Sequence, residues 1–392
     1  MSFSDSDFPP SSTELQQTPL ATDLPPRQPP DVGLPSRSIV RAPRWPHPNF
    51  WWSILWCILF LFVTQIPGAF VAIFIIVVLA LLAPQQYPIE VLGNPKQLMV
   101  SPAMNIALAS AMFVAEALVI SFSWLVIRLV VGRDWMRQLA LRRPSLAHTL
   151  LALASFPALV LLANAAYVLL RNALHVPSLS DYGLHGMEEM VTIFSSWPWA
   201  FAVLVIGLGP GIGEELWCRG FLGRGLVGNY GAFVGVVAAS FFFGVIHVDP
   251  CQGAMAMCMG FWLHFVYLTS RSLWLPMLLH FLNNSFAVLI TRVPQLESIE
   301  NKPSDIPIYV YVTSLFLLSA VAYALYQSRS RLAPQSPQQL ILWRPAYDSV
   351  EYPPEGSGMR VSHPLPSPWS IGSVLLGLLL FAAAFAAWVI RL

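Results

Sequence analysis

The chain has 392 residues, of which 56% are hydrophobic and 10% are charged, and its mean hydropathy is +0.62. A soluble domain carries about 25% charged residues, so this composition excludes an ordinary soluble protein and indicates several membrane-spanning segments. The net charge of +1 gives no sign of a nucleic-acid partner, and we expect none. We therefore expect an all-α, polytopic membrane helical bundle in a lipid bilayer.

The expected elements follow in chain order. Residues 1–48 are polar and rich in proline, which predicts a disordered cytoplasmic tail. A membrane-embedded helical domain follows over residues 50–326, then a flexible linker over 327–368 and an additional transmembrane helix over 369–390. About 20 apolar residues cross a bilayer. By that criterion the chain has eight or nine spans, at approximately 50–82, 105–131, 147–170, 198–222, 231–247, 254–270, 274–293, 307–326 and 369–390.

Loop charges predict the orientation of these spans. Arginines gather before the first span, between the second and third spans, and after the eighth span; examples are Arg41, Arg142 and Arg329. The opposite loops carry glutamates such as Glu188 and Glu297 and few basic residues. Because basic residues are enriched in cytoplasmic loops, this pattern places the N-terminus in the cytoplasm.

Two adjacent carboxylates, Glu214 and Glu215, lie inside the fourth expected span. A charged side chain at the centre of a membrane helix costs about 2.5–3.5 kcal/mol, so it is retained where it is paired or functional. Glu215 and Arg219 share one helix face, and Glu214 points about 100° away from it. Glu215 can therefore pair with the arginine while Glu214 stays free to act as a general base. The alternative is an ion network that only holds the helix in place.

A histidine closes the fifth expected span in the sequence Phe243-Gly-Val-Ile-His247. On its own, this residue also fits a simple helix end at the membrane interface. Asp249 either orients the imidazole or marks the turn before Pro250. His247 lies at one end of the fifth span, and Glu214 lies in the fourth span at a depth that corresponds to the other end. Convergence of the two requires a strongly tilted or partly submerged fifth span.

The seventh expected span carries His280 and Asn284, which project from one helix face and could also serve as interhelical hydrogen-bonding groups. Together the polar residues on these spans form a set able to activate water. Glu214 can act as the base, His247 can position the water, and His280 with Asn284 can stabilise an oxyanion. Alternatively, Glu214, His247 and His280 could hold a divalent metal such as zinc.

In this order, the three motifs resemble those of the CPBP superfamily of intramembrane proteases. This superfamily includes the type II CAAX prenyl endopeptidases and their bacterial, bacteriocin-immunity-like relatives, also called the ABI family. Its patterns are Glu-Glu-x-x-x-Arg, Phe-x-x-x-His and His-x-x-x-Asn. They correspond here to Glu214–Arg219, Phe243–His247 and His280–Asn284. The resemblance covers approximately residues 105–293.

The resemblance implies an intramembrane endopeptidase, similar to the type 2 CAAX prenyl proteases, whose motif helices surround a cavity. Its substrate would be a membrane-associated or lipidated protein or peptide, and its location the plasma membrane of a bacterium. The catalytic residues that the resemblance implies are Glu214, Glu215, Arg219, His247, His280 and Asn284. Dependence on a divalent metal such as zinc stays open.

Two other functions fit the same pattern. A non-catalytic member of the fold would act as a membrane scaffold or partner-binding protein, for which the proline-rich tail and the long linker are suited. A proton-coupled transporter would use the intramembrane glutamate and histidine as a proton relay. The chain shows no inverted repeat, which weighs against a transporter.

Overall fold

The computed structural model describes residues 48–88, 98, 101–174, 193–290, 292, 306–336, 343, 345 and 349–391. The tail expected over residues 1–48 lies outside the described residues, apart from Pro48. Within the described residues, seven helices are long and apolar enough to cross a membrane, and α11 is a shorter apolar helix. The expected all-α, polytopic membrane bundle is therefore confirmed.

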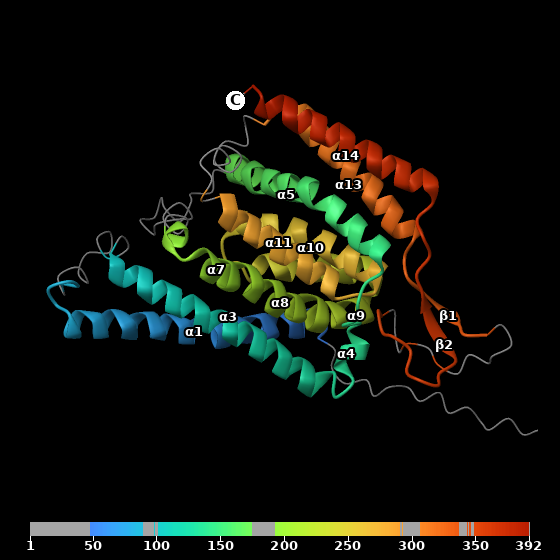
Figure 1. The fold of residues 1–392 in the computed structure, drawn as a ribbon. Helices are drawn as coiled ribbons and strands as arrows, with labels where there is room; N and C mark the ends of the chain where they lie inside the picture. Colours follow the sequence, from blue (N-terminus) through green and yellow to red (C-terminus); the bar gives the residue numbers. More distant parts are fainter. Residues whose placement is uncertain are drawn as a thin grey trace, which may run out of the picture. The chain divides into compact units, whose positions relative to one another are not determined.

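Helices make up almost all of the described elements, and one two-stranded sheet lies near the C-terminus (Figure 1). The elements are α1 (Phe50–Leu82), α3 (Pro102–Val130), α4 (Trp135–Gln138), α5 (Leu146–Leu174), α7 (Trp199–Ala202), η3 (Val203–Leu208), α8 (Gly209–Glu215), η4 (Leu216–Gly223), α9 (Arg224–Val245), α10 (Pro250–Ser270), α11 (Trp274–Ile290), α13 (Ile308–Gln327), β1 (Arg331–Pro334), β2 (Met359–Ser362) and α14 (Pro368–Val389).

Several helix starts follow from local sequence. The side chain of Asn49 accepts a hydrogen bond from a backbone N–H in the first turn of α1, and Ser101 and Ser367 do the same for α3 and α14. Pro102 and Pro368 follow these serines in the first turn, where the missing N–H costs no hydrogen bond. These helices therefore begin where their capping residues predict.

The fourth and fifth expected spans are joined in one continuous helical segment, Trp199–Val245. The helical geometry is interrupted at Gly231, which has φ 78° and ψ 171°, a conformation that glycine adopts at little cost. A Cβ atom at Gly235 would collide with the backbone of Val227 and Leu226, so the chain folds back on itself at this break. The two expected spans lie on either side of Gly231.

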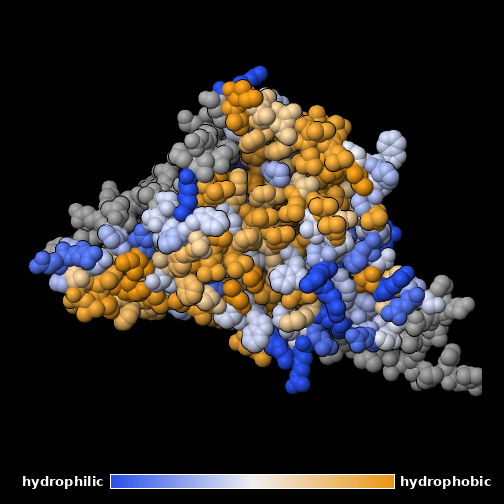
Figure 2. Space-filling model, viewed as in Figure 1, coloured by the Kyte–Doolittle hydropathy of each residue, from blue (hydrophilic) through white to orange (hydrophobic). Residues whose placement is uncertain are grey.

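The helices pack around the segment that carries the two adjacent glutamates. Helix α3 lies along α1 and also contacts α8, while α11 contacts η3 and α8 (Figure 1). Helix α10 lies against α9 and α5, and α5 also contacts α13, which pairs with α14. Figure 2 shows apolar residues over the sides of the helices and a group of strongly hydrophilic residues near β1 and β2. The exposed apolar side chains, such as Phe70 and Leu379, are those expected to face lipid.

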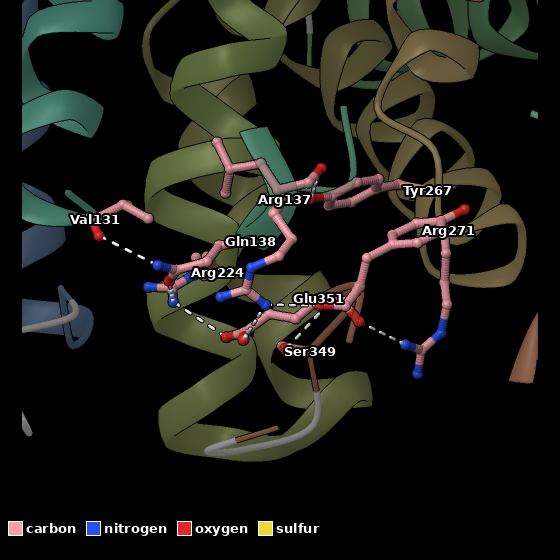
Figure 3. Close-up of polar contacts among 10 residues, drawn as sticks. Val131, Arg137, Gln138, Arg224, Tyr267, Arg271, Ser349 and Glu351 are labelled. Atoms are coloured by element: carbon pink, nitrogen blue, oxygen red, sulfur yellow. Dashed lines mark hydrogen bonds and ion pairs between the residues drawn. The ribbon is translucent and has the colours of Figure 1, made fainter. Parts of the chain in front are cut away.

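The segment expected to be a flexible linker makes defined contacts where it is described. Strand β1 pairs antiparallel with β2, with Arg331 opposite Ser362. The Glu351 carboxylate lies 3.3 Å from Arg224 Nη2 and 3.9 Å from Arg137 Nη1, and its backbone carbonyl accepts a hydrogen bond from Arg271 (Figure 3). These arginines come from three separate parts of the helical bundle. The ion cluster therefore attaches the C-terminal segment to the bundle.

Candidate active site

The glutamate pair lies at the end of a short α-helix that is flanked by two π-helical turns. Helix α8 ends at Glu215, η3 precedes it and η4 follows it. A π-helical turn contains an extra residue and so redirects the side chains around it, and such turns occur frequently at functional sites. The irregular helix is therefore located where the sequence concentrates its ionisable groups.

Glu215 is a fully buried carboxylate with two partners on one oxygen. Its Oε1 lies 2.6 Å from Arg219 Nη1 and 2.9 Å from His280 Nδ1. The pair with Arg219 has the i, i+4 spacing that places both residues on one helix face. Because a carboxylate only accepts hydrogen bonds, Nδ1 of His280 carries the proton and donates it. Glu215 therefore links its own helix segment to α11.

Arg219 extends the same network toward α9 and α10. Its Nη2 donates to the carbonyl oxygen of Gly260 at 3.3 Å, and its guanidinium lies 4.4 Å from the ring centroid of Phe243. The edge of the Phe243 ring system also meets His247 and His280, with centroid distances of 5.1 Å and 5.7 Å. Phe243 therefore contacts one polar residue from each of the three sequence motifs, namely Arg219, His247 and His280.

Glu214 differs from Glu215 because Arg219 forms no ion pair with its carboxylate. Its Oε2 lies 3.9 Å from His280 Nε2 and is buried with no hydrogen-bond partner among the described residues. His280 thus lies between the two glutamates, with Nδ1 toward Glu215 and Nε2 toward Glu214. Glu215 Oε2 is likewise buried without a hydrogen-bond partner among the described residues, but the charge of Glu215 is paired with Arg219, whereas Glu214 has no arginine partner there. Burying a carboxylate that no cation pairs costs free energy, which gives Glu214 a reason to be functional.

His247 lies just past the C-terminal end of α9. Its Nδ1 is 2.8 Å from the carbonyl oxygen of Phe243 and must donate, so Nε2 of the neutral ring is left with a lone pair. Asp249 does not orient this imidazole, because its side chain accepts from the backbone N–H of Gln252 and caps α10. The fifth expected span begins at the break at Gly231, and Phe243 near its end contacts the rings of both His247 and His280.

Asn284 lies on the face of α11 that carries His280. Its Nδ2 donates to the carbonyl oxygen of Ile206 at 3.0 Å, and its Oδ1 accepts from Asn283 at 3.1 Å. The first bond joins α11 to η3. An amide nitrogen has two hydrogens, so a second donor remains on Asn284.

Aromatic packing also holds η4 in place. The fully buried ring of Trp217 stacks on Phe60 of α1 at a centroid distance of 4.6 Å and lies 5.6 Å from Phe122 of α3. Such pairs contribute about 0.5–1.5 kcal/mol each beyond the area they bury. The segment with the glutamates is therefore fixed by packing as well as by charge.

The expected metal ligands do not form a closed group. Within the part of the chain that the structure describes, no three His, Cys, Asp or Glu side chains are grouped closely enough to hold a metal ion. Glu214 Oε2 and His280 Nε2 are 3.9 Å apart, and a donor bond from His280 Nδ1 to Glu215 is compatible with metal binding at Nε2. A metal held by Glu214, His247 and His280 therefore stays a prediction, and the mechanism proposed below uses only the protein's own groups.

One intramembrane acid escaped the sequence analysis. Glu116 lies in α3, and its side chain packs against Gly209 of α8, where a Cβ atom would lie 2.9 Å from Glu116 Oε2. The same signal that singled out Glu214, an acid within an apolar span, was available for Glu116. It was missed because Glu116 belongs to none of the three motifs.

Comparison with known protein families places the motif helices in one of them. Residues 196–286 match the family model described as Type II CAAX prenyl endopeptidase Rce1-like. The match begins before α7, ends within α11 and contains all six residues expected to be catalytic. No curated protein and no solved structure matches the chain.

Proposed function

Because residues 196–286 carry a domain of the CPBP superfamily of intramembrane proteases, we propose that this protein is a membrane-embedded endopeptidase that hydrolyses a peptide bond of a lipidated or membrane-associated protein. The observation that carries the proposal is Glu214, whose Oε2 is buried, has no hydrogen-bond partner among the described residues and lies 3.9 Å from His280 Nε2. The Glu214 side chain is 17% exposed and is not neutralised by an arginine, so its carboxylate is available as a general base.

In the proposed reaction, Glu214 takes a proton from a water molecule. The oxygen of that water bonds to the carbonyl carbon of the scissile peptide and forms a tetrahedral intermediate. The C–N bond then breaks, and Glu214 passes the proton to the leaving nitrogen. The lone pair on His247 Nε2 helps to hold the water before the attack, since Nδ1 of that ring is occupied by the Phe243 carbonyl.

Donors on α11 stabilise the negative charge that develops on the carbonyl oxygen. Asn284 offers its second Nδ2 hydrogen, and His280 donates through Nε2 when that nitrogen is protonated. Glu215 and Arg219 act through His280, whose ring they orient by the 2.9 Å bond to Nδ1. The ion pair is therefore a positioning device, whereas Glu214 meets the reacting water.

The proposal is tested with purified protein in liposomes and an internally quenched peptide that ends in a farnesylated C-a-a-X sequence. We expect Glu214→Gln to lower kcat by about 10³-fold or more, because an amide cannot accept the proton, while the unfolding temperature stays within a few degrees of wild type. Glu215→Ala and His247→Ala should also abolish cleavage. Comparing membrane-protein termini in cells with wild-type and Glu214→Gln protein extends the test to natural substrates. Full activity in Glu214→Gln would sink the proposal.

A further inference from the structure

Glu116 is the one acidic residue in α3, a helix of 29 residues that is otherwise apolar enough to span the membrane. Its Oε2 is buried and has no hydrogen-bond partner among the described residues. An acid with a purely structural role at this depth would be expected to have a hydrogen-bonding or charged partner there. The open oxygen of Glu116 is therefore able to make a hydrogen bond to a bound water molecule.

The packing of α3 against α8 creates a niche for this side chain. Gly209 and Gly213 are four residues apart on the face of α8 that meets α3. A Cβ atom at Gly209 would lie 2.8–2.9 Å from Glu116 atoms, and one at Gly213 would lie 2.5 Å from Val119 Cγ1. Small residues at this spacing let two membrane helices approach closely. Here the missing side chain of Gly209 leaves room for the Glu116 carboxyl group.

The niche lies on the helix that carries the proposed base. Side chains on a helix lean toward its N-terminus, so Glu214 leans back toward the turn that contains Gly209. Glu116 and Glu214 interact electrostatically, and each has a buried Oε2 with no partner among the described residues. Two neighbouring helices thus each carry a carboxyl group with a buried, unpartnered oxygen, and the two groups are close enough to interact.

We propose that Glu116 is a water-positioning residue for the hydrolysis, a role that rests on the proposed function. The attacking water lies between the two carboxyl groups. Glu214 accepts the hydrogen that is transferred, and Glu116 makes a second hydrogen bond that sets the direction of the oxygen lone pair toward the substrate carbonyl. Only Glu214 exchanges a proton with the water, so Glu116 is not consumed or charged by the step.

The test uses the full chain in liposomes with the farnesylated, internally quenched C-a-a-X peptide. Glu116→Ala should lower kcat roughly 10–100-fold with KM within about twofold of wild type, because it removes a contact to the water rather than to the substrate. Glu116→Gln should stay within about fivefold of wild type, because its amide still makes a hydrogen bond to the water. The control is Ser121→Ala, which removes an exposed hydroxyl that bonds only to carbonyls of its own helix.

Three results would overturn the inference: wild-type kcat in Glu116→Ala, equal losses in Glu116→Ala and Glu116→Gln, or a loss of kcat matched by a fall in unfolding temperature in both variants. Its failure is separable from that of the proposed function. If Glu214→Gln is inactive and Glu116→Ala is fully active, only this inference is wrong. If Glu214→Gln cleaves normally, or the wild-type protein cleaves neither the peptide nor any membrane protein, the proposed function fails and this inference with it.

Discussion

Two clusters of glutamate and arginine hold this protein together, and they differ in what they leave unsatisfied. At the C-terminal segment, both oxygens of Glu351 face arginines, with Oε1 toward Arg224 and Oε2 toward Arg137 (Figure 3). In the candidate active site, Arg219 bonds one oxygen of Glu215, while Glu214 next to it keeps a buried oxygen without a partner among the described residues. The same residue types therefore make a cluster in one place whose carboxylate has both oxygens near arginines, and a cluster in the other that leaves one carboxylate without an arginine.

The difference separates charges that fasten parts of the fold together from a charge that is left available to react. The Glu351 cluster joins the ends of elements, where a matched set of charges fastens the C-terminal segment to the bundle. In the candidate active site, two carboxylates lie beside one arginine, so one carboxylate is left without a matching arginine. Removing a charge from water costs several kcal/mol. A buried charge without a partner is therefore expected only where it has a function. We take the unmatched acid as the mark of the functional site.

The largest effect on stability is expected from removing the central arginine. Arg219→Met should lower the free energy of unfolding by about 3–5 kcal/mol, because it leaves the fully buried Glu215 without its cation. The matched change in the other cluster, Arg224→Met, should cost less, about 1.5–3 kcal/mol, because it removes charged hydrogen bonds while Glu351 retains Arg137. Denaturation in mixed micelles, followed by tryptophan fluorescence, measures both. Equal costs would erase the contrast between the clusters.

An intermediate effect is expected at the ring that joins the three motifs. Phe243→Leu removes the aromatic face over Arg219 and the edges against His247 and His280, so it should cost about 1–2 kcal/mol of stability. It should also lower kcat about tenfold or more, since small misplacements of catalytic groups are expensive. Phe241→Leu, at a residue of the same helix that is 46% exposed, is the control and should change neither value measurably. If Phe243→Leu changed neither stability nor kcat, the ring would only fill space between the helices.

The smallest effect is expected from neutralising the matched acid. Glu351→Gln should lower stability by about 0.5–1.5 kcal/mol and leave the rate of peptide cleavage within about twofold, because the amide oxygen still accepts from Arg224. The effect should depend little on salt, because Glu351 is only 7% exposed and salt screens buried pairs much less than exposed ones. Thermal unfolding at low and high salt and the cleavage assay measure this. A large loss of activity would mean that the C-terminal segment takes part in catalysis.

The class of the protein and the faces of its helices were accessible from the sequence. Hydrophobic spans of sufficient length predict an all-α membrane bundle because a backbone in lipid must satisfy its own hydrogen bonds. The pairing of Glu215 with Arg219 follows from helical periodicity, which brings residues four positions apart to one face. The same local rule places His280 and Asn284 together on α11. These features depend on residues that are close in the chain.

What only the tertiary structure decided depends on helices that are far apart in the chain. The position of His280 between Glu214 and Glu215, the contact of Phe243 with Arg219, and the attachment of Glu351 to three arginines follow from packing rather than periodicity. The same holds for Glu116. The sequence shows that it is an acid in an apolar span, but it does not show which helix the side chain faces. A pattern along the sequence states which side chains share a face, and only the packed bundle states what that face meets. That distinction decides which carboxylate is matched and which is left open for chemistry.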